Sequence, residues 1–250
     1  MRAFVTVNFF LCIAFVLLWN SGYIAAKYVL PMASPLTLLA WRFWALALIL
    51  GVFLVITGKF RWPGGKRAGE AMVIGILAHG AWTAFVLYAL KEEVPSGIVA
   101  LVVALQPLLT GILASQFMGE RPSVLNWMGL VLGFVGVGVA VGSRTTFGGE
   151  GTLFGHLLPF GSVLAITVAS LLQRKESVER GDQDISLDQD LFYQSFGAAV
   201  VVTVPAIVIE GLATEINAAF LGGMAWLVLG VSFGAYALCG FWCAVSTPRG

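Results

Sequence analysis

The chain contains 250 residues, of which 59% are hydrophobic and 11% are charged, whereas a soluble globular protein carries about 25% charged residues. Together with a mean hydropathy of +0.92, these values exclude a soluble single domain, a disordered chain and a nucleic-acid-binding protein. The net charge of +1 indicates nothing about acidic partners. The positions of the charges along the chain are more informative than their sum, because they indicate how a membrane protein is oriented.

The apolar residues are gathered into long runs that predict membrane-spanning helices. Each run is close to the roughly 20 residues that a helix needs to cross a bilayer, and none shows the strict alternation of a strand. Pro, Gly and charged residues separate the runs, as expected of connections between helices. We therefore predict an all-α membrane bundle without an extramembrane catalytic domain. The predicted helices cover residues 4–28, 36–57, 69–90, 96–117, 124–142, 152–173, 191–210 and 220–243.

The charges predict how the chain crosses the membrane. The first run follows Arg2 and continues past Asn20 without a cleavage site, so we interpret it as a retained signal anchor. With a cytoplasmic N-terminus, ten basic residues fall inside and three outside, while Arg42 lies within a helix. This excess of basic residues favours a multi-pass protein of a bacterial-type inner (plasma) membrane with its N-terminus in the cytoplasm. The longest loop, Arg174 to Asp190, is interpreted as solvated.

A weak internal sequence similarity suggests two repeats. Gly80-Ala81-Trp82 in the third predicted helix is matched by Gly234-Ala235-Tyr236 in the eighth. If five helices form one unit, the second unit must cross the membrane upside down because five is odd. Inverted repeats are common in transporters, whose substrate site lies between the halves near the middle of the membrane. We therefore divide the chain into a five-helix repeat at 1–147 and a partial repeat at 148–250.

Several motifs of the first half resemble the EamA group of the drug/metabolite transporter superfamily. They are Trp19-Asn20-Ser21-Gly22, Trp41-Arg42-Phe43, Ser96-Gly97-Ile98-Val99-Ala100, Leu105-Gln106-Pro107-Leu108-Leu109 and Met118-Gly119-Glu120-Arg121-Pro122. The resemblance covers the first half nearly end to end, whereas the second half matches poorly by motif. It implies a ten-helix carrier built from two inverted five-helix repeats, with both termini in the cytoplasm.

The end of the chain departs from that family pattern. The resemblance implies two further helices after the eighth, whereas the sequence stops at Gly250. We expect an incomplete second repeat, with eight spans of an expected ten, and a tail that reflects a truncated or frame-shifted reading. Polar groups of the cleft would then face lipid at a cost in free energy. This chain alone is therefore expected to be poorly stable and inactive unless it oligomerises.

Polar and aromatic residues at membrane depth form the first part of a candidate site. On the first helix, Trp19 and Tyr23 are one turn apart on one face, with Asn20 beside them. Asn20 fits a hydrogen bond to a neighbouring helix as well as substrate binding, and Trp19 fits helix packing as well as stacking on a ligand. Arg42 would cost roughly 2.5–3.5 kcal/mol at the membrane centre. It either faces the cavity or extends to the lipid headgroups.

The third and fourth helices supply the other candidates. His79 and Trp82 share a face, and His79 is either a protonatable group within the bilayer or a neutral side chain bonded to a backbone carbonyl. Pro107 lacks a backbone N–H and predicts a kink, which either lines a cavity with Gln106 and Thr110 or is purely structural. We expect all of these residues to converge with those of the first two helices on one central cleft.

The partners that the sequence predicts are a small-molecule substrate and the lipid bilayer. The fifth helix carries Gly129-x-x-x-Gly133 and Gly138-x-x-x-Gly142, which allow close helix packing, either within the repeat or in a homodimer. We expect no nucleic-acid partner, because charged residues are too scarce to form a basic surface.

The chemistry expected is transport rather than catalysis. The sequence contains no Walker motif, glycine-rich dinucleotide turn, HExxH or GxSxG motif, so we expect no enzyme, metal or cofactor. Glu70 and Glu210 lie at helix ends, which leaves proton coupling through His79, facilitated diffusion or exchange as options. The leading hypothesis is a secondary transporter of a small metabolite, an exporter or exchanger working by alternating access. The alternatives are a channel-like or non-transporting helper subunit and, with less support, a lipid-modifying enzyme.

Overall fold

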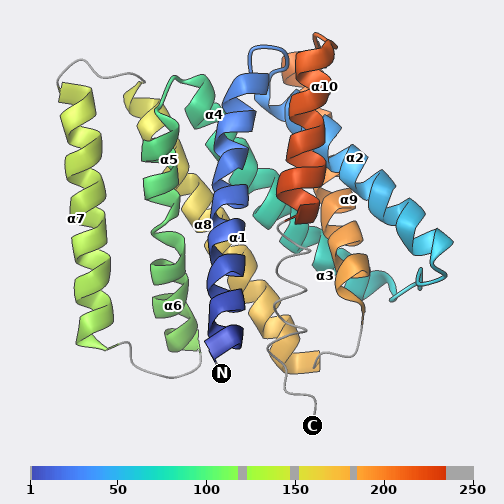
Figure 1. Ribbon diagram of the computed structural model, residues 1–250, viewed down its shortest axis with the longest axis horizontal. Helices are drawn as coiled ribbons and strands as arrows, with labels where there is room; N and C mark the ends of the chain where they lie inside the picture. Colours follow the sequence, from blue (N-terminus) through green and yellow to red (C-terminus); the bar gives the residue numbers. More distant parts are fainter. Residues whose placement is uncertain (1, 118–122, 147–151, 181–184, 235–250) are drawn as a thin grey trace. The chain divides into compact units, whose positions relative to one another are not determined.

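The computed structural model describes residues 2–117, 123–146, 152–180 and 185–234 (Figure 1). Within these ranges the regular structure is helical, apart from one isolated antiparallel β-bridge between Ala33 and Thr214. This confirms the prediction of an all-α bundle. Apolar runs of this length become helices in a membrane because each backbone N–H and C=O is then paired within its own segment.

Each predicted run contains a helix, and several of the helices are interrupted. The first elements are α1 (Arg2–Val29), α2 (Pro35–Ile56), α3 (Gly65–Gly75), the π-helix η1 (Ile76–Ala81), α4 (Trp82–Lys91), α5 (Ser96–Val103), α6 (Gln106–Phe117) and α7 (Val124–Thr146). They are followed by α8 (Leu153–Arg180), α9 (Leu187–Pro205), the π-helix η2 (Ala206–Glu210), α10 (Ala218–Ala225) and the π-helix η3 (Trp226–Gly234). The part of the last predicted run after Gly234 lies outside the described residues.

Five helical segments of the described chain are long and apolar enough to cross a membrane. They are Pro35–Ile56, Gly65–Lys91, Ser96–Ala114, Leu153–Val178 and Leu187–Glu210. Shorter apolar helices lie at Ile13–Val29, Val124–Val139 and Ala218–Gly234. Large apolar side chains on the outer faces, such as Leu48, Ile56 and Val208, are largely exposed. Such surfaces suit contact with lipid rather than water.

The helices form two compact units, and the first combines both ends of the chain. It contains α1, up to Ala33, together with α10 and η3, which follow Thr214. α1 packs against α10 and η3. The indole Nε1 of Trp226 donates a hydrogen bond to Oγ of Ser21 at 2.9 Å, so a polar contact accompanies this packing.

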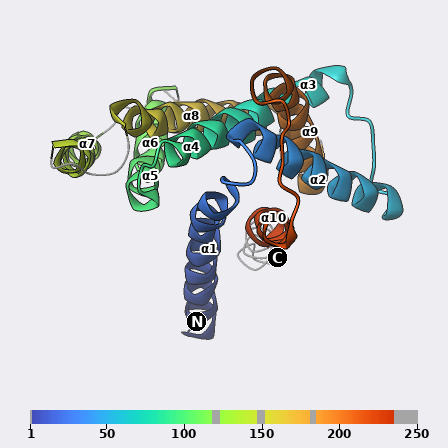
Figure 2. The ribbon, with the colours of Figure 1, turned by 90° about the horizontal axis from the view of Figure 1, so that it is seen from above.

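The second unit covers Ser34–Ala213 and is referred to below as unit 2. In it α2 packs against α9, α9 also contacts α3 and η1, and α8 contacts α4, α5 and α6. α7 packs against α5 and α6 and lies at one edge of unit 2 (Figures 1 and 2). Two helices from the second half of the sequence thus pack onto helices of the first half. The division into repeats at 1–147 and 148–250 stays a prediction.

Glycine permits a close crossing of α3 and α9. A Cβ atom on Gly75 would overlap the backbone of Gln194, and one on Gly197 would lie 2.7 Å from Cβ of Met72. Helices approach this closely only where a side chain is absent. The crossing therefore holds the backbone of Gln194 directly against α3.

Three interruptions break the long helices of unit 2. α5 ends at Val103 and α6 begins at Gln106, so the break predicted at Pro107 is present. Pro107 is the second residue of α6, where its missing N–H removes no helical hydrogen bond. The π-helices η1, after Gly75, and η2, after Pro205, were not predicted from the sequence. Such turns are rare and often occur at functional sites.

Polar side chains gather at two ends of unit 2. We call the first of them the Arg67 end; it contains the starts of α3 and α9 and the end of α8. Arg67 contacts both α8 and α9 there. We call the second the Glu210 end; it contains the start of α2 and the last residues of α4 and η2. Glu210 contacts α2 and α4 there. The segments 65–91 and 187–210 both run from the first end to the second. The starts of α3 and α9 and the end of α8 consequently lie on one side of unit 2.

Candidate functional site

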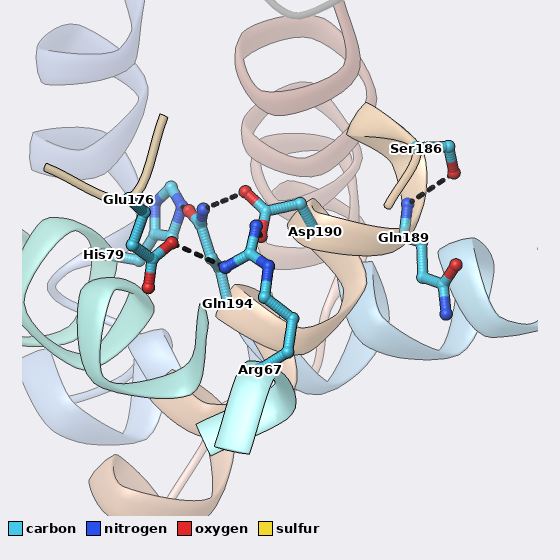
Figure 3. Close-up of polar contacts among 7 residues, drawn as sticks. All are labelled: Arg67, His79, Glu176, Ser186, Gln189, Asp190 and Gln194. Carbon is cyan, nitrogen blue, oxygen red and sulfur yellow. Dashed lines mark hydrogen bonds and ion pairs between the residues drawn. The ribbon is translucent and has the colours of Figure 1, made fainter. Parts of the chain in front are cut away.

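Arg67 joins three helices at the Arg67 end. Its Nη1 lies 2.5 Å from Oε2 of Glu176 on α8, and its Nη2 lies 3.2 Å from Oδ1 of Asp190 on α9 (Figure 3). The three side chains are only 15–16% exposed. A guanidinium that forks to two carboxylates forms strong, oriented hydrogen bonds. The interpretation of residues 174–190 as a solvated loop is therefore wrong for these two acids, because Glu176 belongs to α8 and Asp190 to α9.

The sequence at the start of α9 explains the position of Asp190. Ser186 precedes the helix, and its hydroxyl accepts a hydrogen bond from the backbone N–H of Gln189 at 3.4 Å (Figure 3), which is a typical N-cap. Asp190 occupies the first turn, where the helix dipole favours negative charge. The side-chain amide of Gln189 donates to the backbone oxygen of Arg61, which ties the start of α9 to the segment before α3.

His79 and Gln194 form a polar contact in the interior of unit 2. Nε2 of His79 lies 3.1 Å from Oε1 of Gln194, and Nε2 of Gln194 donates to Oδ2 of Asp190 at 2.7 Å. Because a carboxylate only accepts hydrogen bonds, it turns the amide so that its oxygen faces the imidazole. The proton of this contact then lies on Nε2 of His79. His79 is thus linked to the Arg67 ion pairs through a single amide (Figure 3).

Arg42 and Trp82 lie in the same part of unit 2 as His79. The Cζ atom of Arg42 is 5.8 Å from the ring centroid of Phe43, and that buried ring is 5.8 Å from the imidazole of His79. The cation on α2 and the histidine in η1 thus both lie near the ring of Phe43. Trp82 is the first residue of α4, one turn after His79, and is half-buried.

Gln106 and Thr110 contribute to a second polar cluster, between α6 and α8. Nε2 of Gln106 donates to Oγ1 of Thr110 at 3.1 Å and lies 3.5 Å from Oγ of Ser170. The hydroxyl of Thr110 donates to that of the buried Thr167 at 3.4 Å. Pro107 is exposed. An amide and three hydroxyls are thus in hydrogen-bonding contact beside the break between α5 and α6.

The candidates of the first helix belong to the other unit. Trp19 stacks on Phe15 with ring centroids 5.7 Å apart. Asn20 is exposed, and its Nδ2 donates to the backbone oxygen of Val16 at 2.8 Å, so this amide is satisfied within α1. Tyr23 is buried. The convergence of these residues with the candidates of unit 2 on one cleft stays a prediction.

Glu210 holds together the opposite end of unit 2. Its Oε2 accepts hydrogen bonds from the backbone N–H of Thr37 at 2.8 Å and from the Thr37 hydroxyl at 2.9 Å. Its Oε1 accepts from the N–H of Leu36 at 3.2 Å and from the hydroxyl of Tyr88 at 3.0 Å. α2 begins at Pro35, whose fixed φ suits the first turn. The unpaired N–H groups that follow attract a negative charge.

The contacts of Gln194, Glu210 and the Arg67 ion pairs were not predicted as site features. One signal was readable, since Asp190 and Gln194 are four residues apart in an otherwise apolar run and so share a helix face. Arg67, the ion-pair partner of Asp190, is more than a hundred residues away in the sequence. No local pattern connects residues at that separation.

Comparisons with known proteins identify a matching family and several relatives. Residues 7–142 match the model of the EamA-like transporter family. The chain is 32% identical over 124 residues to the Uncharacterized inner membrane transporter YedA of Escherichia coli strain K12, which covers 50% of this chain and 40% of that protein. It is 30% identical over 169 residues to the Uncharacterized transporter YvbV of Bacillus subtilis, covering 64% of this chain and 51% of that protein.

A plant relative extends the comparison. The WAT1-related protein At3g02690, chloroplastic, of Arabidopsis thaliana is 28% identical over 138 residues, which cover 55% of this chain and 33% of that protein. The chain thus spans about half of the length of these relatives or less. The family match includes Arg67, His79 and Gln106, and it covers more than half of the sequence. The chain therefore belongs to the EamA-like transporter family.

Proposed function

We propose that this protein is a secondary transporter that moves a small polar metabolite across the cell membrane by alternating access, as an exporter or an exchanger. One observation carries the proposal: two membrane-spanning segments, 65–91 and 187–210, are joined by polar contacts at three depths. Arg67 contacts Asp190 at one end, His79 contacts Gln194 between the ends, and Tyr88 contacts Glu210 at the other end.

The spacing along the helix supports a central binding position for His79. At 1.5 Å per residue, His79 is about 18 Å from Arg67 and about 14 Å from Tyr88 along the segment. The hydrocarbon core of a bilayer is about 30 Å thick. His79 and Gln194 would therefore lie near the middle of the membrane, the depth at which transporters of this kind bind substrate.

The contacts at the two ends suit alternating access. Opening one end requires Arg67 to leave Glu176 and Asp190, and opening the other requires Tyr88 and α2 to leave Glu210. When only one set is broken, the His79–Gln194 pair becomes accessible from only one side. The π-helices η1 and η2 lie within the two joined segments, and such turns are common positions of helix bending.

The side chains near the middle of unit 2 favour a small polar substrate. Gln106, Gln194 and the hydroxyls beside them can donate and accept hydrogen bonds, while Arg42 supplies a cation that attracts an anionic group. Amino acids and nucleobases carry groups of this kind. Uptake of labelled amino acids and nucleobases into proteoliposomes tests the proposal: saturable uptake supports it, whereas flux that rises linearly with concentration indicates a channel.

A cross-link at the Arg67 end tests the mechanism separately. In a chain whose three native cysteines are replaced by Ala, we would introduce Arg67→Cys with Glu176→Cys. Oxidation should stop saturable uptake, and reduction should restore it, because α3 and α8 must separate during transport. The two single-cysteine variants control for the substitutions. Undiminished uptake by the oxidised double variant would contradict gating at this end.

We propose that the N-terminus and the Arg67 end face the cytoplasm. The excess of basic residues in the connections on that side supports this orientation. A membrane-impermeant thiol reagent should label Gly148→Cys from outside and should not label Gly65→Cys. The position at 148 lies outside the described residues. The opposite labelling pattern would reverse the orientation.

We also propose α7 as the contact helix of a homodimer. Gly133 packs within unit 2, where a Cβ would lie 2.8 Å from Cδ2 of Leu105, whereas a Cβ on Gly136 or Gly138 would meet no atom within 4 Å. The open glycines leave room for a second helix to approach. A Gly138→Cys variant should cross-link to a second copy in membranes, and an Asn126→Cys control should cross-link less; equal cross-linking would contradict an α7 interface.

A further inference from the structure

Polar side chains from α6 and α8 gather beside the break between α5 and α6, and their contacts are loose. Nε2 of Gln106 lies 3.1 Å from Oγ1 of Thr110 and 3.5 Å from Oγ of Ser170. Oγ1 of Thr110 lies 3.4 Å from Oγ1 of Thr167. Strong hydrogen bonds measure about 2.7–3.2 Å from an amide and about 2.5–3.0 Å between hydroxyls. Two of the three contacts are longer than this. We call these four side chains the oxygen cluster.

The spacing within the oxygen cluster is that of ligands around a small cation. Na⁺ and Ca²⁺ are of similar size, and the oxygen ligands of Ca²⁺ lie about 2.3–2.6 Å from the ion. Two such ligands at right angles are about 3.3–3.7 Å apart. The contacts of 3.4 and 3.5 Å fall within this range. Turning the amide of Gln106 by half a rotation places its oxygen where Nε2 now lies, at little change in shape.

The hydroxyl protons do not have to point into the oxygen cluster. Oγ of Ser170 already donates to the backbone oxygen of Ile166, one turn earlier in α8, at 2.7 Å. Thr110 and Thr167 lie within α6 and α8, where a threonine hydroxyl can donate in the same way to the carbonyl four residues before it. The lone pairs of all three hydroxyl oxygens are then free to bind a cation.

The helix break adds negative charge near the middle of the membrane. Pro107 has no N–H, so the carbonyl of Val103, four residues earlier, lacks its helical donor. α5 also ends at Val103, and the C-terminal end of a helix favours cations. Gln106 lies about 15 Å along the helix from Ser96, where this membrane span begins, and the hydrocarbon core is about 30 Å thick. Secondary transporters bind coupling ions at this depth, on the carbonyls of broken helices.

The sequence around the oxygen cluster favours a monovalent ion. Residues 96–117 and 153–173 contain no Asp, Glu, Lys or Arg. Ca²⁺ sites are built with carboxylates, and burying charge without a counter-charge is costly, so neutral oxygens suit a single positive charge better than two. K⁺ is larger than Na⁺ and needs its ligands farther apart.

We propose that the oxygen cluster and the carbonyl of Val103 bind Na⁺, and that this Na⁺ is the coupling ion of transport. The ion is carried across the membrane rather than retained as a cofactor, and the His79–Gln194 pair remains for the substrate. The coupling rests on the proposed function, whereas the binding of Na⁺ does not.

The purified full-length chain tests the site without transport. Its thermal unfolding is measured in detergent while Na⁺ replaces K⁺ or choline at constant ionic strength, so that screening is unchanged. Na⁺ should raise the midpoint saturably, and K⁺ should not. Thr167→Val, which keeps the shape of the side chain, and Ser170→Ala should each weaken the Na⁺ affinity about tenfold or more. Thr167→Ser keeps the oxygen and should bind Na⁺ as the unmodified chain does.

Ser162→Ala is the matched control on α8, because the buried Ser162 hydroxyl donates to the backbone oxygen of Pro159 outside the oxygen cluster. It should keep the full Na⁺ affinity. Equal shifts by Na⁺ and K⁺, or a Na⁺ shift that survives in both Thr167→Val and Ser170→Ala, would overturn the site. If those variants do not fold, binding of radioactive Na⁺ to the unmodified chain decides, and equal displacement by K⁺ and by Na⁺ would overturn the site.

Uptake into proteoliposomes tests the coupling. Replacing Na⁺ by K⁺ on both sides should abolish saturable uptake by the unmodified chain. Saturable uptake that continues unchanged without Na⁺ would overturn the coupling and leave the proposed transport intact. Selective Na⁺ binding by a chain that shows no saturable uptake would support the site and contradict the proposed transport.

Discussion

The two ends of unit 2 are both held by carboxylates, but by different partners. At the Arg67 end a guanidinium lies between two carboxylates from separate helices. At the Glu210 end one carboxylate receives four hydrogen bonds, two of them from the backbone N–H groups of Leu36 and Thr37. Long side chains can exchange a partner for water without moving the backbone, whereas backbone donors move only with their helix. Side-chain motion can therefore release the ion pairs at the Arg67 end before α3 and α8 separate, while the contacts at the Glu210 end break only when α2 is displaced.

The largest effect is expected from Arg67→Ala. The substitution leaves two mostly buried carboxylates side by side without their cation, which should lower the free energy of unfolding by about 3–5 kcal/mol. Chemical or thermal unfolding of the detergent-solubilised protein measures it. Lys59→Ala, which removes an exposed cation just before α3, should change stability by less than about 0.5 kcal/mol. Equal effects of the two variants would remove the structural role assigned to Arg67.

A methyl group added where α3 crosses α9, between the two ends, should lower the free energy of unfolding by less than Arg67→Ala does. Gly75→Ala introduces a Cβ that overlaps the backbone of Gln194, and overpacking of this kind costs about 1–3 kcal/mol. Gly69→Ala on the same helix is the matched control, because its Cβ would meet no atom within 4 Å. It should be neutral or stabilise the protein by up to about 1 kcal/mol through helix propensity. Destabilisation of equal size in both variants would contradict a close crossing at Gly75.

At the Glu210 end, Glu210→Gln tests whether the carboxylate acts through its charge. The amide keeps one accepting oxygen and brings an NH₂ group against backbone donors, so stability should fall by about 1–2 kcal/mol. Glu215→Gln, at an exposed acid, should leave the unfolding transition where it is. If Glu210→Gln is as stable as the unmodified protein, the hydrogen bonds at this end do not depend on the charge of Glu210.

The smallest effect is the response to salt, and it distinguishes the two ends. Raising the ionic strength from 0.1 to 1 M shortens the screening length from about 10 to about 3 Å. The ion pairs at the Arg67 end should weaken by less than about 1 kcal/mol, and the neutral donors at the Glu210 end should not respond. Salt should therefore destabilise the unmodified protein and the Glu210→Gln variant alike. Arg67→Ala should lose this response or gain stability in salt, because salt screens the repulsion between the two remaining carboxylates. Persistence of the full response in Arg67→Ala would contradict this assignment.

The helices of this protein were largely predictable because apolar runs of membrane length have one stable structure in lipid. The break before Pro107 follows from a missing N–H and was predicted too. The extension of α8 to Arg180 was not, because charged residues after Leu172 suggested a solvated loop. Glu176 there is neutralised by a partner on α3, and that partner lies about a hundred residues away in the sequence.

The candidate site was predictable in part. His79 and Gln106 were singled out because polar side chains at membrane depth need partners, and both have such contacts in unit 2. The identity of those partners, Gln194 and Ser170, depends on how α8 and α9 pack onto the first half, which periodicity does not encode. The crossing at Gly75 could not be predicted from the sequence either. The chain contains thirty glycines, and their spacing does not show which one contacts another helix.

The most direct test of alternating access measures from which side Gln194 can be reached. A Gln194→Cys variant without other cysteines is treated in oriented membranes with an impermeant thiol reagent from each side. Added Arg67→Ala should speed labelling from the Arg67 end only, and added Glu210→Ala should speed labelling from the Glu210 end only. Labelling that rises from both sides together, or from neither side in both variants, would contradict a central site that the two ends close in turn.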